Sequence, residues 1–347
     1  MKRLLFLLVL VLVPVAASAA MTDRDVLVTS DGTVFSIVSE LVGDSAAGST
    51  ISELALTVQR GAIVTRAVVP ETLNTGINWR PALAYDADSK TLLLVWLRMP
   101  NAMSSEILVA TYQNGKWTPA VSIDSKPYVV RYNLSVGITR RVSQLQKDGS
   151  YADVPALLLH AAWWEQNGDG EAARYALLNV EKGAIRSIEL HDLVDFIETP
   201  SVTAGPDPNA DRELLRHVAV LDQGDQSSVD VLFADSKTST FHRVTLKPIA
   251  DARVRIPVGR GPGNGPGGPI HFPAAKSLPT GWSGRTSTIT SHDGKTFIFC
   301  NMLPERVSYL SYSFNARNWS TVKDIALTDS VTADIAVSAL ARMIANQ

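Results

Sequence analysis

The sequence of 347 residues has a single cysteine, little net charge and, after its first residues, no long apolar run. Because Cys300 has no partner in the chain, a fold held together by disulfides is excluded. A net charge of −2 offers no basic surface of the kind that nucleic-acid binding requires. The 22 glycines and 18 prolines are too few for a collagen-like or low-complexity protein. Hydrophobic residues make up 46% of the chain, so a folded protein is expected.

The N-terminus has the pattern of a secretory signal peptide. Lys2 and Arg3 precede an apolar run over residues 4–13, and Ala17-Ser18-Ala19 offers the small residues that a signal peptidase reads. A membrane anchor is the alternative, but a spanning helix needs roughly 20 apolar residues. We therefore expect cleavage near Ala19 and a secreted or periplasmic protein without a membrane span.

Five short apolar runs recur along the chain and predict a repeated unit of β-strands. They begin 58, 65, 61 and 79 residues apart and occupy residues 33–38, 91–96, 156–161, 217–222 and 296–301. Each is too short for a typical helix and rich in β-branched or bulky residues, which is typical of a strand buried on both faces. We therefore expect a core strand at the same place in each unit.

Each apolar run is the second strand of its unit, and a third strand, a tight turn and a more polar outer strand follow it. The turns include Asn114-Gly115 and Lys182-Gly183, which are signals of a β-hairpin. Another strand precedes each run, so the unit is a four-stranded antiparallel meander of about 60 residues. The sequence thus predicts an all-β fold, a β-propeller of five or six four-stranded blades. A two-sheet β-sandwich is the alternative.

The end of the chain changes period. Val337, Leu340, Ala341 and Ile344 share one face of a helix, which predicts a short C-terminal helix packed on the propeller. The predicted organisation is therefore a signal peptide over 1–19, a propeller over 20–328 and a helix over 329–347.

The loops after the second strands and before the first strands are predicted to be long, and they should meet at one end of the propeller; long loops on a rigid scaffold are where binding residues usually reside. Carboxylates beside arginine and tryptophan suit a polar, ring-shaped ligand such as a sugar. The weak candidates for catalysis are Glu165, Asp222 and Asp225. The candidates for ligand binding are Trp79, Arg80, Arg98, Trp282 and Arg285.

One segment is similar to the first half of a calcium-binding loop. Glu165, Asn167 and Asp169 are spaced by two, and a glycine stands sixth. The twelfth position is Ala176, which cannot ligate a metal, so no cofactor is expected and calcium is the alternative. The six histidines show no zinc spacing.

Three other features have plainer interpretations. The Gly/Pro-rich stretch 259–269 lacks the Gly-Lys-Ser/Thr of a phosphate-binding loop and is either a flap over the candidate end or an insertion. His160 lies inside an apolar strand and is expected to be a hydrogen-bonded core residue. Cys300 lies within an apolar run and is expected to be a buried thiol that packs as a small hydrophobic residue.

The repeated pattern resembles the sialidase-like superfamily of β-propellers. The similarity lies in inner strands that end in tryptophan (Trp96, Trp163) and outer strands that begin with one (Trp117, Trp319). The turn 293–297 and the tripeptide 255–257 add to it. The resemblance implies the propeller fold, and it carries over no arginine triad, tyrosine nucleophile or acid.

The sequence leaves three functions open. The first is an exported propeller that binds a glycan or a protein partner without chemistry of its own. The second is a sialidase-like glycoside hydrolase acting on extracellular glycans, which needs two carboxyl groups, or a tyrosine and an acid, around the scissile bond. The third is an assembly component that docks through its C-terminal helix. Whether the protein is an enzyme is left open, with binding favoured.

Overall fold

The computed structural model describes residues 24–44, 50–101, 103–168, 170–196, 218–222, 227–235, 240–250, 253–255, 287–290, 296–302, 306–313 and 318–326. They are mostly strands, with two short 3₁₀ helices, η1 (Pro70–Thr72) and η2 (Leu193–Phe196). No helix in these ranges is long and apolar enough to cross a membrane. The fold is therefore all-β, as the sequence predicts. The predicted signal peptide, the stretch 259–269 and the predicted C-terminal helix lie outside the described residues.

The described strands form five antiparallel meanders, called units one to five below. Unit one contains β1 (Arg24–Val28), β2 (Val34–Asp44), β3 (Thr50–Arg60) and β4 (Ile63–Val68). Unit two contains β5 (Ile77–Asp86), β6 (Thr91–Asn101), β7 (Ser104–Gln113), β8 (Lys116–Trp117) and β9 (Val121–Asp124). Unit three contains β10 (Val130–Leu145), β11 (Tyr151–Asn167), β12 (Gly170–Glu181) and β13 (Ala184–Asp192).

Units four and five complete the set. Unit four contains β14 (Val218–Asp222), β15 (Val229–Asp235), β16 (Thr240–Ile249) and β17 (Arg253–Arg255). Unit five contains β18 (Ser287–Thr290), β19 (Thr296–Met302), β20 (Arg306–Ser313), β21 (Asn318–Trp319) and β22 (Lys323–Ala326). The five predicted apolar runs coincide with the strands β2, β6, β11, β14 and β19, and four of them, all but β14, are the second strand of their unit as predicted. The number of blades, five or six, stays a prediction.

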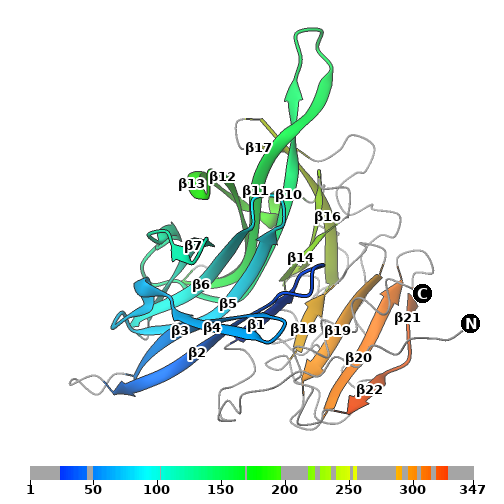
Figure 1. The fold of residues 1–347 in the computed structure, drawn as a ribbon. Coiled ribbons are helices and arrows are strands. Elements are labelled where there is room, and N and C mark those ends of the chain that lie inside the picture. Colours follow the sequence, from blue (N-terminus) through cyan, green and yellow to red (C-terminus); the bar gives the residue numbers. More distant parts are fainter. Residues whose placement is uncertain are drawn as a thin grey trace, which may run out of the picture.

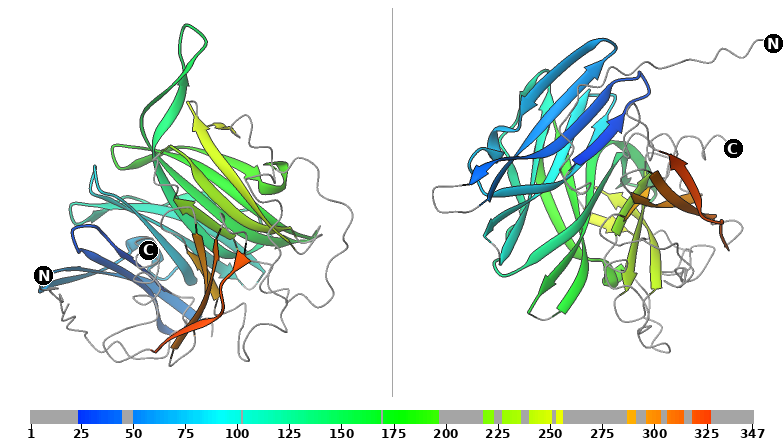
Figure 2. Two further views of the ribbon diagram at one scale, coloured as in Figure 1. Left: turned by 90° about the vertical axis from the view of Figure 1, so that its right-hand side faces the viewer. Right: turned by 90° about the horizontal axis from the view of Figure 1, so that it is seen from below.

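The first strand of each unit packs against the first strand of the next, in the order β1, β5, β10, β14 and β18. The sheets stand at different angles around these first strands (Figures 1 and 2). Repetition of four-stranded meanders around shared inner strands is the architecture of a β-propeller and not of a two-layer sandwich.

The core lies between successive units, because each central strand buries both of its faces. Residues on β6 point alternately to the two neighbouring units. Leu94 and Trp96 pack in a cluster with unit one, whereas Leu93 and Val95 pack in a cluster with unit three. A third cluster joins units three and four. This arrangement explains the continuous apolar runs, since a strand covered on both sides has no solvated face.

The predicted tight turns are present. Gly61, Asn114, Gly115, Lys182 and Gly183 all adopt positive φ. Two consecutive residues with positive φ make the hairpin turn whose twist matches that of the flanking strands, and Asn-Gly is its preferred sequence.

Unit four differs from the prediction. The sequence assigned residues 217–222 to a second strand, but β14 is the first described strand of its meander and neighbours β10. β16 pairs parallel with β10 at Ser143 and Ile249, and β14 runs in the same direction as β16. β14 is therefore parallel to β10, which is the direction of a first strand.

The loops after the second strands also differ from the prediction. The sequence indicated long loops there, but only two residues separate β6 from β7 and β11 from β12. Strand pairing extends into these segments down to the pairs Asn101–Ser104 and Asn167–Gly170. The longer described connections lead from one unit to the next, as in residues 69–76 with η1.

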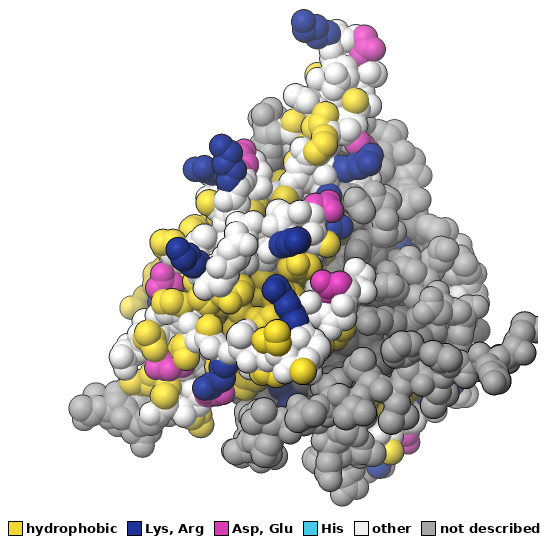
Figure 3. All heavy atoms as spheres, in the orientation of Figure 1, with side chains coloured by type: hydrophobic (Ala, Val, Ile, Leu, Met, Phe, Trp, Pro, Cys, Tyr) yellow, Lys and Arg dark blue, Asp and Glu magenta, His cyan; other side chains and the backbone are white. Residues whose placement is uncertain are grey.

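The β10–β11 hairpin extends well beyond the sheets (Figure 1). Its base is tied to unit four, since the Ala250 amide donates to the Ser143 carbonyl and Lys247 Nζ lies 3.1 Å from Asp153 Oδ1. Towards its tip, Leu145 and Tyr151 pair across the strands and are exposed. Figure 3 shows charges of both signs at the tip, with hydrophobic side chains below them.

Candidate functional site

Two β-bulges occupy equivalent positions at the start of β5 and β10. In β5 the register shifts between Trp79 and Ala82, and Arg80 has a φ of 50°. In β10 it shifts between Tyr132 and Ser135, and Asn133 also has a φ of 50°. A bulge places two residues opposite one and redirects the side chains around it. An arginine in the left-handed region is unusual, and such strain gathers at binding sites.

The two bulges lie at the same end of neighbouring strands. At the far end of β5, Asp86 Oδ1 accepts a hydrogen bond of 2.6 Å from Nε of Arg140, near the far end of β10. Trp79 lies seven residues before Asp86, and Tyr132 lies eight residues before Arg140. Because β5 and β10 pack side by side, the bulges are level with each other. We call Trp79, Arg80, Tyr132 and Asn133 the bulge surface.

The bulge surface combines aromatic rings with polar groups. Cζ of Arg80 lies 5.3 Å from the centre of the Trp79 ring, a cation–π contact that orients both side chains. The Tyr132 hydroxyl donates to Oε1 of Gln166 at 2.8 Å. Trp79, Arg80, Tyr132 and Asn133 are all partly exposed. A partly exposed aromatic ring beside polar groups can pack on the apolar face of a ligand whose edge is hydroxylated.

In unit two, the bulge follows a buried asparagine. The amide of Asn78 donates to Ser52 Oγ at 2.7 Å, and Nδ2 donates to the Ser52 carbonyl at 2.7 Å. Nδ2 also contacts the Thr72 carbonyl at 3.2 Å. Oδ1 accepts from the indole nitrogen of Trp96, the residue opposite the bulge, at 3.1 Å. Asn78 is fully buried and thereby joins unit one to unit two.

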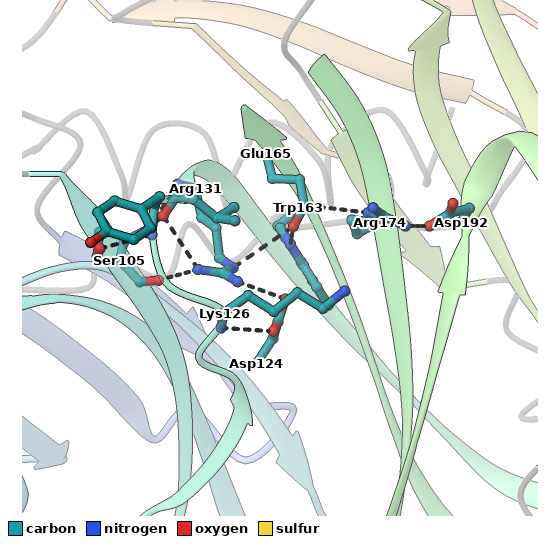
Figure 4. Close-up of polar contacts among 11 residues, drawn as sticks. Ser105, Asp124, Lys126, Arg131, Trp163, Glu165, Arg174 and Asp192 are labelled. Carbon is teal, nitrogen blue, oxygen red and sulfur yellow. Dashed lines mark hydrogen bonds and ion pairs between the residues drawn. The ribbon is translucent and has the colours of Figure 1, made fainter. Parts of the chain in front are cut away.

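In unit three, the equivalent position is a fully buried arginine, Arg131. Its amide donates to Ser105 Oγ at 2.7 Å, and Nη1 donates to the Ser105 carbonyl (Figure 4). Nη2 lies 2.7 Å from Oδ2 of Asp124. Ser105 and Asp124 belong to unit two, so Arg131 joins unit two to unit three in the same way that Asn78 joins the preceding pair.

Glu165 completes this second junction. Its Oε2 lies 3.8 Å from Arg131 Nε and accepts from the indole nitrogen of Trp163 at 3.2 Å. Its Oε1 accepts from Arg174 Nε at 2.7 Å, and Arg174 pairs in turn with Asp192 near the surface. Figure 4 shows Glu165 between the two arginines. Both carboxylate oxygens are occupied, and only 2% of the residue is exposed.

The structure does not bring Glu165 and Asp222 together. Glu165 pairs with Arg131 at the start of β10. Asp222 ends β14, which runs parallel to β10, and Val220 in that strand donates to Ser135 Oγ. Asp222 therefore lies towards the opposite end of the sheets. Asp225 lies outside the described residues. The environment of Glu165 is that of a counter-ion, and its catalytic role stays a prediction.

Three of the five candidates for ligand binding lie among the described residues. Trp79 and Arg80 lie in the bulge surface. Arg98 lies at the same end, opposite Asn78, and its Nε donates to Oε1 of Glu106 at 2.8 Å. Trp282 and Arg285 lie outside the part of the chain that the structure describes.

Two of the candidate calcium ligands, Glu165 and Asn167, lie at the end of β11. Oδ1 of Asn167 accepts from the Gly170 amide at 3.1 Å within a two-residue turn, and Glu165 is already paired. Asp169 is not among the described residues. Within the described ranges, no group of three His, Cys, Asp or Glu side chains could hold a metal ion.

Two predictions for buried residues are confirmed. His160 is fully buried, with Nε2 2.9 Å from Thr139 Oγ1 and Nδ1 2.6 Å from the Tyr175 hydroxyl. Burial lowers the pKa of His160 to about 3, because the charged ring would lose its hydration. Cys300 is also fully buried, and burial raises the pKa of its thiol.

Sequence reasoning missed Asn78 and Arg131, although a signal for them exists. The Ser52–Asn78 and Ser105–Arg131 hydrogen bonds each join residues 26 positions apart. In both cases a polar residue stands directly before an aromatic residue at the start of a first strand. Two such coincidences in successive repeats indicate equivalent roles.

No protein-family model matches the sequence, and no curated protein matches it. Among solved structures, a Mycobacterium tuberculosis puromycin-hydrolysing peptidase matches 89% of this chain at 11% identity, with a TM-score of 0.40. The chain spans only 39% of that peptidase. A GH43_1 enzyme from Xanthomonas citri matches over 90% of this chain and 88% of its own, at 11% identity and a TM-score of 0.36.

The β-propeller domain of the Trilobed protease from Pyrococcus furiosus matches 88% of this chain and 86% of its own, at 11% identity and a TM-score of 0.33. The sialidase resemblance finds only a weak counterpart, since NanB sialidase from Streptococcus pneumoniae matches with a TM-score of 0.30. Because all of these TM-scores are low, the assignment of a propeller rests on the strand order of the chain itself.

Proposed function

We propose that the chain is an exported β-propeller that binds a glycan through the bulge surface and has no chemistry of its own. One observation carries the proposal: two level bulges on neighbouring inner strands present an aromatic residue followed by a polar residue with positive φ. Tryptophan and tyrosine offer apolar area for the ring of a sugar, and Arg80 and Asn133 offer partners for its hydroxyl groups.

The sequence predicted a binding region in long loops. The proposal places it instead at the starts of β5 and β10, at the same end of the molecule. Glycoside hydrolysis gains less support, because it needs two carboxyl groups around one bond. Glu165 is held between arginines, and Asp222 lies towards the other end of the sheets. Export through the predicted signal peptide is part of the proposal.

Binding of the purified chain to an oligosaccharide array that includes neutral and sialylated glycans tests the proposal. We expect binding that Trp79→Ala weakens at least tenfold, which corresponds to about 1.4 kcal/mol. Tyr151→Ser is the matched control, since Tyr151 is an exposed aromatic residue on the projecting hairpin and should leave binding unchanged. Absence of binding by folded protein would refute the proposal. Turnover of fluorogenic glycosides that Glu165→Gln abolishes would establish the hydrolase instead.

A further inference from the structure

Asn78 and Arg131 stand immediately before the two bulges, and their contacts correspond one by one. Each donates its amide to a serine hydroxyl of the preceding unit at 2.7 Å. Each side chain donates to the carbonyl of that same serine. Each also reaches the carbonyl two residues before itself, Gly76 or Val129, at 3.4 Å. The two residues therefore fix the strand at the same point, directly ahead of the bulge.

The tryptophan opposite each bulge is tied to the same group of contacts. Trp96 opposes Arg80 and Pro81, and its indole donates to Oδ1 of Asn78. Trp163 opposes Asn133 and Leu134, and its indole donates to Oε2 of Glu165. The strand before each bulge and the tryptophan opposite it are thereby joined through polar side chains, Asn78 alone in unit two and Arg131 with Glu165 in unit three.

The indole of the opposing tryptophan needs a hydrogen-bond acceptor, and the two units supply it differently. An amide side chain has both, so Asn78 can hold the carbonyl groups and the indole by itself. A guanidinium has donors only, so Arg131 cannot accept from the Trp163 indole. The Glu165 carboxylate supplies that acceptor and also faces Arg131 Nε. Register places Glu165 opposite Arg131, where unit two has Arg98 opposite Asn78.

We propose that Asn78 and the Arg131–Glu165 pair are positioning residues that hold the two bulges in their binding geometry. The inference rests on the proposed function, since it assigns these residues to the same surface. They do not contact a ligand themselves, because all three are buried. They act by fixing the strand that carries Trp79 and Arg80 in one unit, and Tyr132 and Asn133 in the other.

The test compares Asn78→Ala with Glu165→Gln in the full chain, by amide hydrogen exchange and by binding of sialyllactose and xylotriose. Glutamine keeps an acceptor for the Trp163 indole and removes the charge, so the variant should fold. We expect Glu165→Gln to speed exchange at least fivefold more in segment 130–135 than in segment 77–82. Asn78→Ala should do the reverse, and both variants should weaken binding at least fivefold.

A general loss of stability would speed exchange in both segments alike, and that result would overturn the inference. Unchanged exchange in both segments would overturn it too. If Asn78→Ala does not fold, Ser52→Ala replaces it, because Ser52 accepts the Asn78 amide hydrogen bond. If neither sugar binds the unaltered chain, the proposed function loses its support while the exchange result still decides the positioning role.

Discussion

The junction between units one and two and the junction between units two and three solve one structural problem with different chemistry. In the first, neutral Asn78 satisfies its neighbours with a single amide. In the second, Arg131 does the same work with the help of Asp124 and Glu165, all of them almost fully buried. The difference shows that a buried carboxylate near a candidate binding surface can be a consequence of the donor it faces and need not be a catalytic group.

The charged junction should be the more sensitive of the two. Arg131→Ala leaves the carboxylates of Asp124 and Glu165 facing an emptied site, and breaking a buried ion pair costs about 3–5 kcal/mol. We expect a loss of that size in the free energy of unfolding, measured by urea denaturation. A loss below 1 kcal/mol would show that the second junction is not held by charge.

The neutral junction should lose less. Asn78→Ala removes several hydrogen bonds and leaves the Trp96 indole without an acceptor, but it leaves no buried charge. Unsatisfied buried polar groups cost about 1–3 kcal/mol, so we expect a destabilisation of about 2 kcal/mol in the same assay. If this variant lost more stability than Arg131→Ala, the comparison of the two junctions would be wrong.

A pH titration tests a neutral buried group, His160, in the same unit as the charged junction. His160 has a pKa of about 3 in the folded chain and 6.5 as its ordinary value. The unfolded chain therefore binds one more proton between these values, so stability is complete above pH 6.5 and falls as the pH drops towards 3. The slope is about 1.4 kcal/mol per pH unit.

At pH 5 this effect amounts to about 2 kcal/mol relative to pH 7. His160→Gln, which can keep both hydrogen bonds, should lack this part of the decline. Urea denaturation at pH 7, 6 and 5 gives the free energy of unfolding of the unaltered chain and of His160→Gln. The difference between the two proteins isolates His160, because the carboxylates contribute equally to both. Parallel curves would contradict the assignment of His160 as a neutral buried residue.

The smallest effect is expected at Arg98, which occupies the register position that Glu165 has in the next unit. Arg98 pairs with Glu106, and both side chains are partly exposed. Ion pairs of this kind contribute about 0–1 kcal/mol, so Arg98→Ala should change stability by less than about 1 kcal/mol. A loss comparable to that of Arg131→Ala would make Arg98 part of the first junction.

The repeat and the strands were predictable because a strand buried on both faces leaves a continuous apolar run. Leu92, Leu93 and Leu94 are such a run, and both of their faces pack against neighbouring units. The tight turns were predictable from Asn-Gly and Lys-Gly, since positive φ limits the residues that fit there.

The ends of the strands were not predictable in the same way. Assigning β14 as a second strand placed Asp222 at the wrong end, because one strand more or less reverses the direction of the chain. The acidic character of Glu165 suggested a loop, whereas strand pairing continues to Asn167 and buries the carboxylate against Arg131. Such pairing depends on a neighbouring unit, which no local pattern records.

A double-mutant cycle at the second junction measures the coupling between Arg131 and Glu165. Arg131→Asn, Glu165→Leu and the double variant are compared by urea denaturation. Arg131→Asn should be destabilised because Asp124 and Glu165 lose the guanidinium that they face. Glu165→Leu should be destabilised because the Trp163 indole and Arg174 lose their acceptor. Asp124 loses the guanidinium in Arg131→Asn and in the double variant alike, so its contribution cancels in the cycle. Because the double variant no longer has Glu165 facing a lost charge, we expect it to be at least about 1.5 kcal/mol more stable than the sum of the single losses. Strictly additive losses would contradict the account, because Glu165 would then be present for a reason independent of Arg131.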